Sequence, residues 1–148
     1  MKTMIVYDSA FGNTEKIAAT VRGALRGEVT MLRPAQARPA EIKGIDLLIV
    51  ASPTLGGRPT EAIQAFLDKV PAASLRGVRV AALDTRLSVM FARLFGYAAD
   101  KMSSSLVKSG GIQAAAPEGF IVKGRRGPLA EGEIERAAVW AKGLAGVP

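Results

Sequence analysis

The chain has 148 residues, of which 49% are hydrophobic and 22% are charged, a composition typical of one globular domain with a substantial core. It contains neither Cys nor His, which excludes disulfides, cysteine zinc sites, Ser-His-Asp triads and the commonest general base of enzymes. The 20 Lys and Arg residues exceed the 13 Asp and Glu residues by a formal charge of +7. These cations are spread along the chain, with the densest cluster at Lys123, Arg125 and Arg126, so we interpret them as a solvated basic surface and expect no nucleic acid partner.

The first half of the chain alternates strand-like and helix-like patterns. Residues 3–8 predict a strand, and residues 13–26 predict a helix because apolar side chains recur there at helical spacing. Residues 28–32 alternate as a short strand, whereas residues 33–41 carry two prolines and predict a loop or a frayed turn. Residues 45–51 are nearly all apolar, as expected of a strand buried on both faces of a sheet.

The second half continues this alternation. We expect a helix at residues 60–70, a strand at 78–84, a helix at 87–108, a strand at 111–122 and a helix at 130–144. The helix at 87–108 carries an apolar stripe from Phe91 to Leu106 that we interpret as core, and the last strand is interrupted near Pro117. About five strand–helix alternations predict one α/β domain over residues 1–148, with a doubly wound parallel sheet and helices on both faces.

Three predicted loops follow the carboxyl ends of predicted strands, at residues 9–14, 51–59 and 83–88. All three are rich in small, hydroxyl or glycine residues, whereas the strands are not. Ligands of doubly wound sheets bind beyond the carboxyl ends of the strands, where the strand order switches. We therefore expect a binding site where these loops meet.

The first of these loops has the chemistry of an anion site. Gly12 permits a tight backbone path, and Ser9 and Thr14 offer hydroxyl groups just before a helix N-terminus, which favours negative charge. A phosphate fits this pattern, and plain helix capping by Asn13 or Thr14 fits it equally well. The loop lacks the GxxxxGK[ST] and GxGxxG spacings, which argues against an NTPase and against a Rossmann dinucleotide site.

The second loop is built for unusual backbone angles. Pro53 fixes one dihedral angle, and Gly56 and Gly57 permit positive φ and a peptide flip. An ordinary turn would explain this loop alone. Beside the first loop, it suggests a phosphorylated planar ligand wedged between the two.

These stretches resemble one family. DSAFGNTEKIA, at residues 8–18, is similar to the phosphate loop of flavodoxins, roughly (S/T)-x-T-G-x-T, and SPTLGGRPT, at residues 52–60, resembles their second flavin loop. Residues 118–144 are similar to the C-terminal strand and helix of small flavodoxin-family proteins, so the resemblance covers nearly the whole chain. It implies a five-stranded sheet in the order 2-1-3-4-5, bound FMN and electron transfer, in the short-chain form of the family.

The resemblance also implies which residues bind FMN. The first loop would hold the phosphate through hydroxyl and backbone N–H groups of Ser9, Ala10, Gly12, Asn13 and Thr14, with Phe11 among them. The second loop would line one side of the isoalloxazine with Pro53, Thr54, Leu55, Gly56 and Gly57. The third loop would open on the other side with Asp84, Thr85 and Arg86. A separate hypothesis is that Arg86, if placed near the N1 edge of the flavin, favours the anionic reduced form and raises the potential of that couple; a plain surface Arg in a loop explains the residue equally well. We expect no catalytic side chain and no metal.

Three positions depart from the family pattern. Phe11 stands where the family usually has Thr, and Leu55 stands where an aromatic ring often stacks on the flavin. The third loop has no Tyr at its start, and its first aromatic residues are Phe91, Phe95 and Tyr97. Ring stacking is worth about 0.5–1.5 kcal/mol, so we expect FMN to bind roughly tenfold more weakly than with stacked rings.

The sequence thus predicts an FMN-binding electron carrier with partners of acidic docking surface, since typical flavodoxins are acidic and this chain is basic. The alternative is an FMN-dependent NAD(P)H:quinone-type reductase, which needs a substrate pocket often completed by a dimer partner. A phosphoacceptor receiver needs an Asp where residues 51–53 read Ala-Ser-Pro, and a phosphatase of this topology needs a Cys. With no apolar run of about 18 residues and no signal peptide pattern, we expect a cytoplasmic monomer or weak dimer without membrane insertion.

Overall fold

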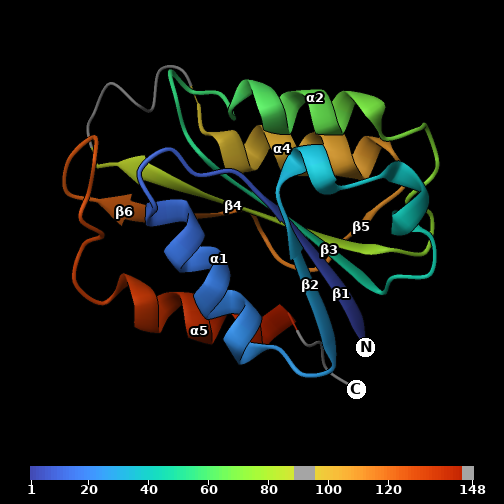
Figure 1. Ribbon diagram of the computed structural model, residues 1–148, viewed down its shortest axis with the longest axis horizontal. Coiled ribbons are helices and arrows are strands. Elements are labelled where there is room, and N and C mark those ends of the chain that lie inside the picture. Colours follow the sequence, from blue (N-terminus) through green and yellow to red (C-terminus); the bar gives the residue numbers. More distant parts are fainter. Residues whose placement is uncertain (89–95, 145–148) are drawn as a thin grey trace.

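A parallel sheet divides the molecule into two layers of helices (Figure 1). The computed structural model describes residues 1–88 and 96–144. Its strands are β1 (Lys2–Tyr7), β2 (Glu28–Leu32), β3 (Leu47–Pro53), β4 (Arg79–Leu87), β5 (Ile112–Gln113) and β6 (Glu118–Val122). Its helices are α1 (Asn13–Ala24), α2 (Glu61–Lys69), α4 (Ala98–Lys108) and α5 (Glu133–Leu144), with short 3-10 turns η1 (Pro34–Gln36) and η2 (Pro39–Ile42).

The strands follow the order β2-β1-β3-β4-β5, with β6 also paired to β4, and every pairing is parallel. The predicted doubly wound order is therefore confirmed. The fifth position of the sheet is shared by two short strands, because β5 pairs with Arg79 and Val80 while β6 pairs with residues 83–87. The predicted interruption of the last strand falls between them, around Pro117.

Helices α1 and α5 cover one face of the sheet, and α2 and α4 cover the other (Figure 1). In β3, Leu48 and Val50 belong to the core under α2 and α4, whereas Leu47 and Ile49 belong to the core under α1 and α5. All four are fully buried, which explains why this strand is apolar at every position from Leu47 to Ala51. Each such side chain contributes about 1.5–3 kcal/mol through its removal from water.

One predicted element is wrong in its bounds. In the stretch expected as a helix at 87–108, Leu87 is the last residue of β4, and residues 96 and 97 precede α4, which begins at Ala98. Strand β4 extends this far because its second half pairs with both β3 and β6, a long-range pairing that the local pattern does not encode. Within α4, Met102 and Leu106 are buried as expected, whereas Phe91 and the stripe up to residue 95 lie outside the described residues.

Two smaller expectations can be compared with the structure. The stretch predicted as a loop or frayed turn at residues 33–41 forms η1 and η2, each with a proline at its start. Across residues 1–88 and 96–144, none of the helices combines the length and the hydrophobicity that a bilayer crossing requires.

Candidate functional site

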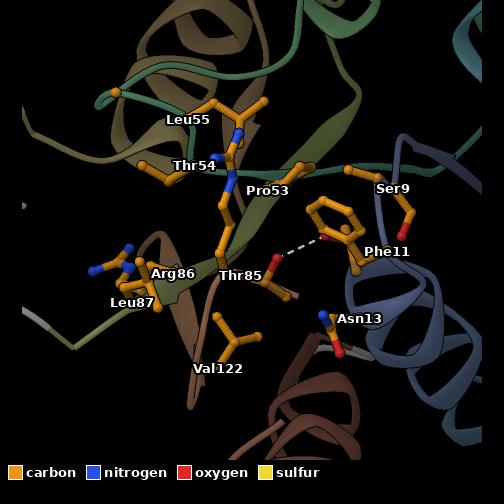
Figure 2. A pocket seen from close by; sticks show the side chains of 14 residues that line it. Ser9, Phe11, Asn13, Pro53, Thr54, Leu55, Thr85, Arg86, Leu87 and Val122 are labelled. Atoms are coloured by element: carbon orange, nitrogen blue, oxygen red, sulfur yellow. Dashed lines mark hydrogen bonds between the residues drawn. The ribbon is translucent and has the colours of Figure 1, made fainter. Parts of the chain in front are cut away.

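The loops after β1 and β3 and the end of β4 meet around a cavity of about 310 Å³ at the carboxyl edge of the sheet. Figure 2 shows Ser9 and Phe11 on one side of this cavity and Arg86 and Leu87 on the other. Most residues that the sequence predicted for the site line it: Ser9, Ala10, Phe11, Asn13, Thr14, Pro53, Thr54, Leu55, Gly56, Thr85 and Arg86. Gly12, Gly57 and Asp84 lie beside it without lining it.

The start of α1 presents backbone N–H groups to the cavity. Gly12 is the N-cap, with a left-handed φ of 91°, and as a glycine it has no side chain that could bond the helix. Ser9 Oγ accepts hydrogen bonds from the N–H groups of Gly12 at 3.0 Å and Glu15 at 3.3 Å. Within the described residues, the N–H groups of Asn13 and Thr14 have no protein acceptor. These two residues begin the helix and do not cap it, and the side chain that bonds the helix start is that of Ser9.

The side chains of Asn13 and Thr14 bind other parts of the protein. Asn13 Nδ2 donates to the Arg126 carbonyl at 3.2 Å, and the Thr14 and Thr85 hydroxyl oxygens lie 2.7 Å apart, the bond drawn in Figure 2. Both side chains are buried. The backbone N–H groups of Asn13 and Thr14 and the Ser9 hydroxyl keep donors for an anion, and so does the Thr14 hydroxyl when Thr85 is the donor in their bond.

The second loop is a two-residue hairpin that holds Leu55 at the cavity. The N–H groups of Leu55 and Arg58 each donate to the other's carbonyl, at 2.8 and 3.0 Å. Gly56 and Gly57 have φ values of 57° and 79°, so the predicted positive angles are confirmed and define a type I′ turn. The turn leaves Leu55 half exposed on the cavity wall and Gly57 buried behind it.

The segment expected as a third loop at residues 83–88 is instead the end of β4 up to Leu87, and an internal ion pair occupies it. Asp84 is fully buried and accepts hydrogen bonds from Arg86 Nε at 2.7 Å, Arg86 Nη2 at 2.8 Å and the Ala99 N–H at 2.9 Å. Burial alone would lower the pKa of Arg86, but the hydrogen bonds and charge of Asp84 outweigh it and raise this pKa. The pairing offsets much of the charge through which we expected Arg86 to act on a flavin.

Two neighbours fix the Arg86 guanidinium in place. Tyr97, which the sequence placed inside a helix, precedes α4 and lies with its ring 3.5 Å from the guanidinium carbon. The backbone of Gly119 also lies against the Arg86 side chain, so a Cβ added there would collide with it. Next to them, Thr54 Oγ1 accepts a hydrogen bond from the Ala98 N–H at 3.0 Å. Asp84 and Thr54 therefore bind the first N–H groups of α4.

Three lining residues were missed from the sequence, namely Leu87, Val122 and Arg125. Leu87 lay in the loop expected at residues 83–88 but was not named as a site residue, and the other two come from the end of β6 and the loop after it, which were not placed near the site. The basic cluster at residues 123–126 was the available signal. Among the described residues that line the cavity, none is acidic.

The mouth of the cavity is apolar and basic. Phe11, Leu55 and Leu87 are 48%, 49% and 37% exposed, which is unusual for large apolar side chains. The exposed Arg125 lines the cavity, and the Arg126 guanidinium carbon lies 5.6 Å from the centre of the Phe11 ring. In residues 1–88 and 96–144, no cluster of three or more acidic side chains could hold a metal ion.

The sequence also matches known proteins. A family model described as a flavodoxin domain matches residues 4–108. The chain belongs to the flavodoxin family. No curated protein matches this flavodoxin by sequence.

Solved structures show the same fold. Flavodoxin 2 from Bacillus cereus is 23% identical, with a TM-score of 0.83 over 98% of each chain. A flavodoxin from the domain Archaea is 18% identical, with a TM-score of 0.79 over 98% of this chain and 96% of that one. A short-chain flavodoxin associated with a non-canonical PDU bacterial microcompartment is 22% identical, with a TM-score of 0.78 over 99% of each chain. These similarities confirm the flavodoxin fold predicted from the loops.

Proposed function

We propose that this flavodoxin binds FMN in the cavity and carries electrons between redox proteins. One observation carries the proposal: the same cavity combines unpaired N–H groups at the start of α1 with apolar wall residues such as Leu55 and Leu87. FMN has the matching parts, a phosphate and a planar ring system. The volume of about 310 Å³ is at the small end of ligand sites, which run from roughly 300 to 1,000 Å³.

The residues divide between the two parts of FMN. The N–H groups of Asn13 and Thr14, the Ser9 hydroxyl and the helix dipole would hold the phosphate. Leu55 and Leu87 would exclude water from the ring. When bound, FMN supplies the redox chemistry itself, so the protein needs no acid, base or nucleophile of its own. A chain without Cys and His is compatible with that division.

The mouth of the cavity indicates the kind of partner. Exposed apolar side chains at Phe11, Leu55 and Leu87 lie next to Arg125 and Arg126. A protein with an acidic rim around an apolar centre would complement this surface, and opposite charges would speed its encounter with the flavin edge.

The test is FMN binding to the purified protein, followed by the visible spectrum and by quenching of FMN fluorescence. We expect saturable binding that Leu55→Asp weakens. Ile112→Asp serves as the matched control, because Ile112 is also exposed but lies in β5 opposite Arg79, at the amino end of β4. A protein that neither retains nor quenches FMN would overturn the proposal.

A second measurement separates the carrier from the reductase alternative. The FMN-loaded protein is incubated with NADPH and a quinone, with and without a separate flavodoxin reductase. The carrier should oxidise NADPH only when the reductase is present. Rapid turnover by this chain alone would instead support a quinone reductase.

A further inference from the structure

Arg33 reaches behind the anion-binding loop from the end of β2. Its Nη1 donates to Asp8 Oδ1 at 3.0 Å and to the Ser9 carbonyl at 3.3 Å, and its Nη2 lies 3.5 Å from Glu15 Oε1. Its guanidinium carbon also lies 4.7 Å from the centre of the Tyr7 ring. One side chain therefore joins the end of β1, the loop and the first turn of α1, without lining the cavity itself.

These contacts fix Ser9 from three directions. Its N–H donates to Asp8 Oδ1 at 2.9 Å, and its carbonyl accepts from Arg33. Its Oγ accepts from the N–H groups of Gly12 and Glu15. Arg33 thus holds the Ser9 carbonyl and also the carboxylate that binds the Ser9 N–H. The proton of the Ser9 hydroxyl remains to be donated into the cavity that Ser9 lines.

The charges around the loop at residues 9–14 also indicate a role for Arg33 in anion binding. Asp8 and Glu15 flank the loop with two negative charges, while residues 9–14 contain no Lys or Arg. A phosphate bound here would be repelled by both carboxylates. Arg33 is the cation that contacts them, and it offsets part of that repulsion at short range.

We infer that Arg33 is a positioning residue that gives the cavity its preference for a phosphorylated flavin over the same flavin without phosphate. The inference rests on the proposed function, since it concerns how the same site selects FMN. Arg33 acts through Ser9 and through the two carboxylates, so its effect is confined to ligands that carry a phosphate.

The test compares dissociation constants for FMN and riboflavin by fluorescence quenching in wild type, Arg33→Gln, Arg33→Lys and Arg38→Gln. In Arg33→Gln, FMN should bind about tenfold more weakly and riboflavin within about twofold of wild type, as expected for loss of charge-assisted contacts. The FMN affinity of Arg33→Lys should fall between those of wild type and Arg33→Gln, because a lysine keeps the charge but lacks the planar group that reaches two carboxylates and a carbonyl. Arg38→Gln removes an equal charge from the next turn of the chain and should leave both ligands unchanged.

The possible outcomes test the role of Arg33 separately from FMN binding itself. Equal FMN affinity in Arg33→Gln and Arg38→Gln would overturn the inference while leaving FMN binding intact. An equal loss of FMN and riboflavin in Arg33→Gln would also overturn it, since a general collapse of the loop would not distinguish the ligands. Failure of the wild type to bind FMN would overturn the proposed function itself.

Discussion

Two helices of this flavodoxin begin at the same edge of the sheet and use their N-termini in opposite ways. At α4, the Thr54 hydroxyl and the buried Asp84 carboxylate accept from the first two N–H groups of the helix, those of Ala98 and Ala99. At α1, Gly12 is the cap and has no side chain, and Ser9 Oγ accepts only from the third N–H group of the helix, that of Glu15. Within the described residues, the first two N–H groups, those of the cavity-lining Asn13 and Thr14, have no acceptor.

The difference shows what distinguishes a helix start that stabilises a parallel α/β fold from one that can bind a ligand. Every helix start in such a fold offers the same unpaired N–H groups and the same positive end of a dipole. When the protein supplies its own acceptors, the helix start stabilises the fold. When the protein leaves the first N–H groups without acceptors, a ligand anion can accept their hydrogen bonds. Substitutions at the two starts should therefore change different properties, stability at α4 and FMN binding at α1.

The largest expected effect is at α4. Asp84→Ala should lower the free energy of unfolding by about 3 kcal/mol, because it leaves the largely buried Arg86 and the Ala99 N–H without their partner. Urea denaturation of the ligand-free protein measures this. Asp8→Ala is the control, because Asp8 is partly exposed and its loss should change stability by less than about 1 kcal/mol. Equal losses in both variants would remove the distinction between the two helix starts.

The next effect is at α1. Gly12→Ala forces a residue with a side chain into a φ of 91°, which costs about 1–2 kcal/mol, and relaxation of that strain should turn the loop N–H groups and weaken FMN binding roughly tenfold. Gly44→Ala is a matched control, since Gly44 has a φ of 86° and, like Gly12, has no atoms near the added Cβ. Both variants should lose similar stability in thermal unfolding. If both also bind FMN as the wild type does, the cap at Gly12 does not orient the site.

The smallest effect concerns the hydrogen bond between the start of α1 and β4. Thr85→Val removes the 2.7 Å hydrogen bond to Thr14 and should cost about 1 kcal/mol, because a buried hydroxyl loses its partner. Thr14→Val should cost a similar amount. A double-mutant cycle of unfolding free energies should show that the paired substitution costs less than the sum of the two. Strict additivity would show that this bond does not couple α1 to β4.

Much of the fold could be predicted from the sequence because the strands are apolar in patterns set by their faces. The apolar run at residues 45–51 predicted a strand buried on both faces, and β3, which begins within it at Leu47, is such a strand. The end of β4 could not be predicted in the same way. Its extension to Leu87 depends on pairing with β6, more than 30 residues later in the chain, and on contacts of Asp84 with Arg86 and Ala99.

The site was predictable in position and less so in detail. The rule that loops at the carboxyl edge converge located the cavity, and most predicted residues line it. The sequence could not show which polar side chains bind the protein itself. From the sequence, Asp84 and Thr54 were predicted to bind a flavin. Their partners in the structure include the first N–H groups of α4, and backbone N–H groups cannot be recognised from residue types. Their assignment to FMN, like that of the other site residues, stays a prediction.

The bond between Asn13 and the Arg126 carbonyl spans 113 positions of the chain. The region that identifies the family ends at residue 108, yet Val122 and Arg125 complete the cavity wall. A nascent chain that has folded only its family-defining region would therefore have no finished site. Contacts of such long range form late compared with local ones, so cofactor capture would follow assembly of the last strand and would stabilise only the completed molecule.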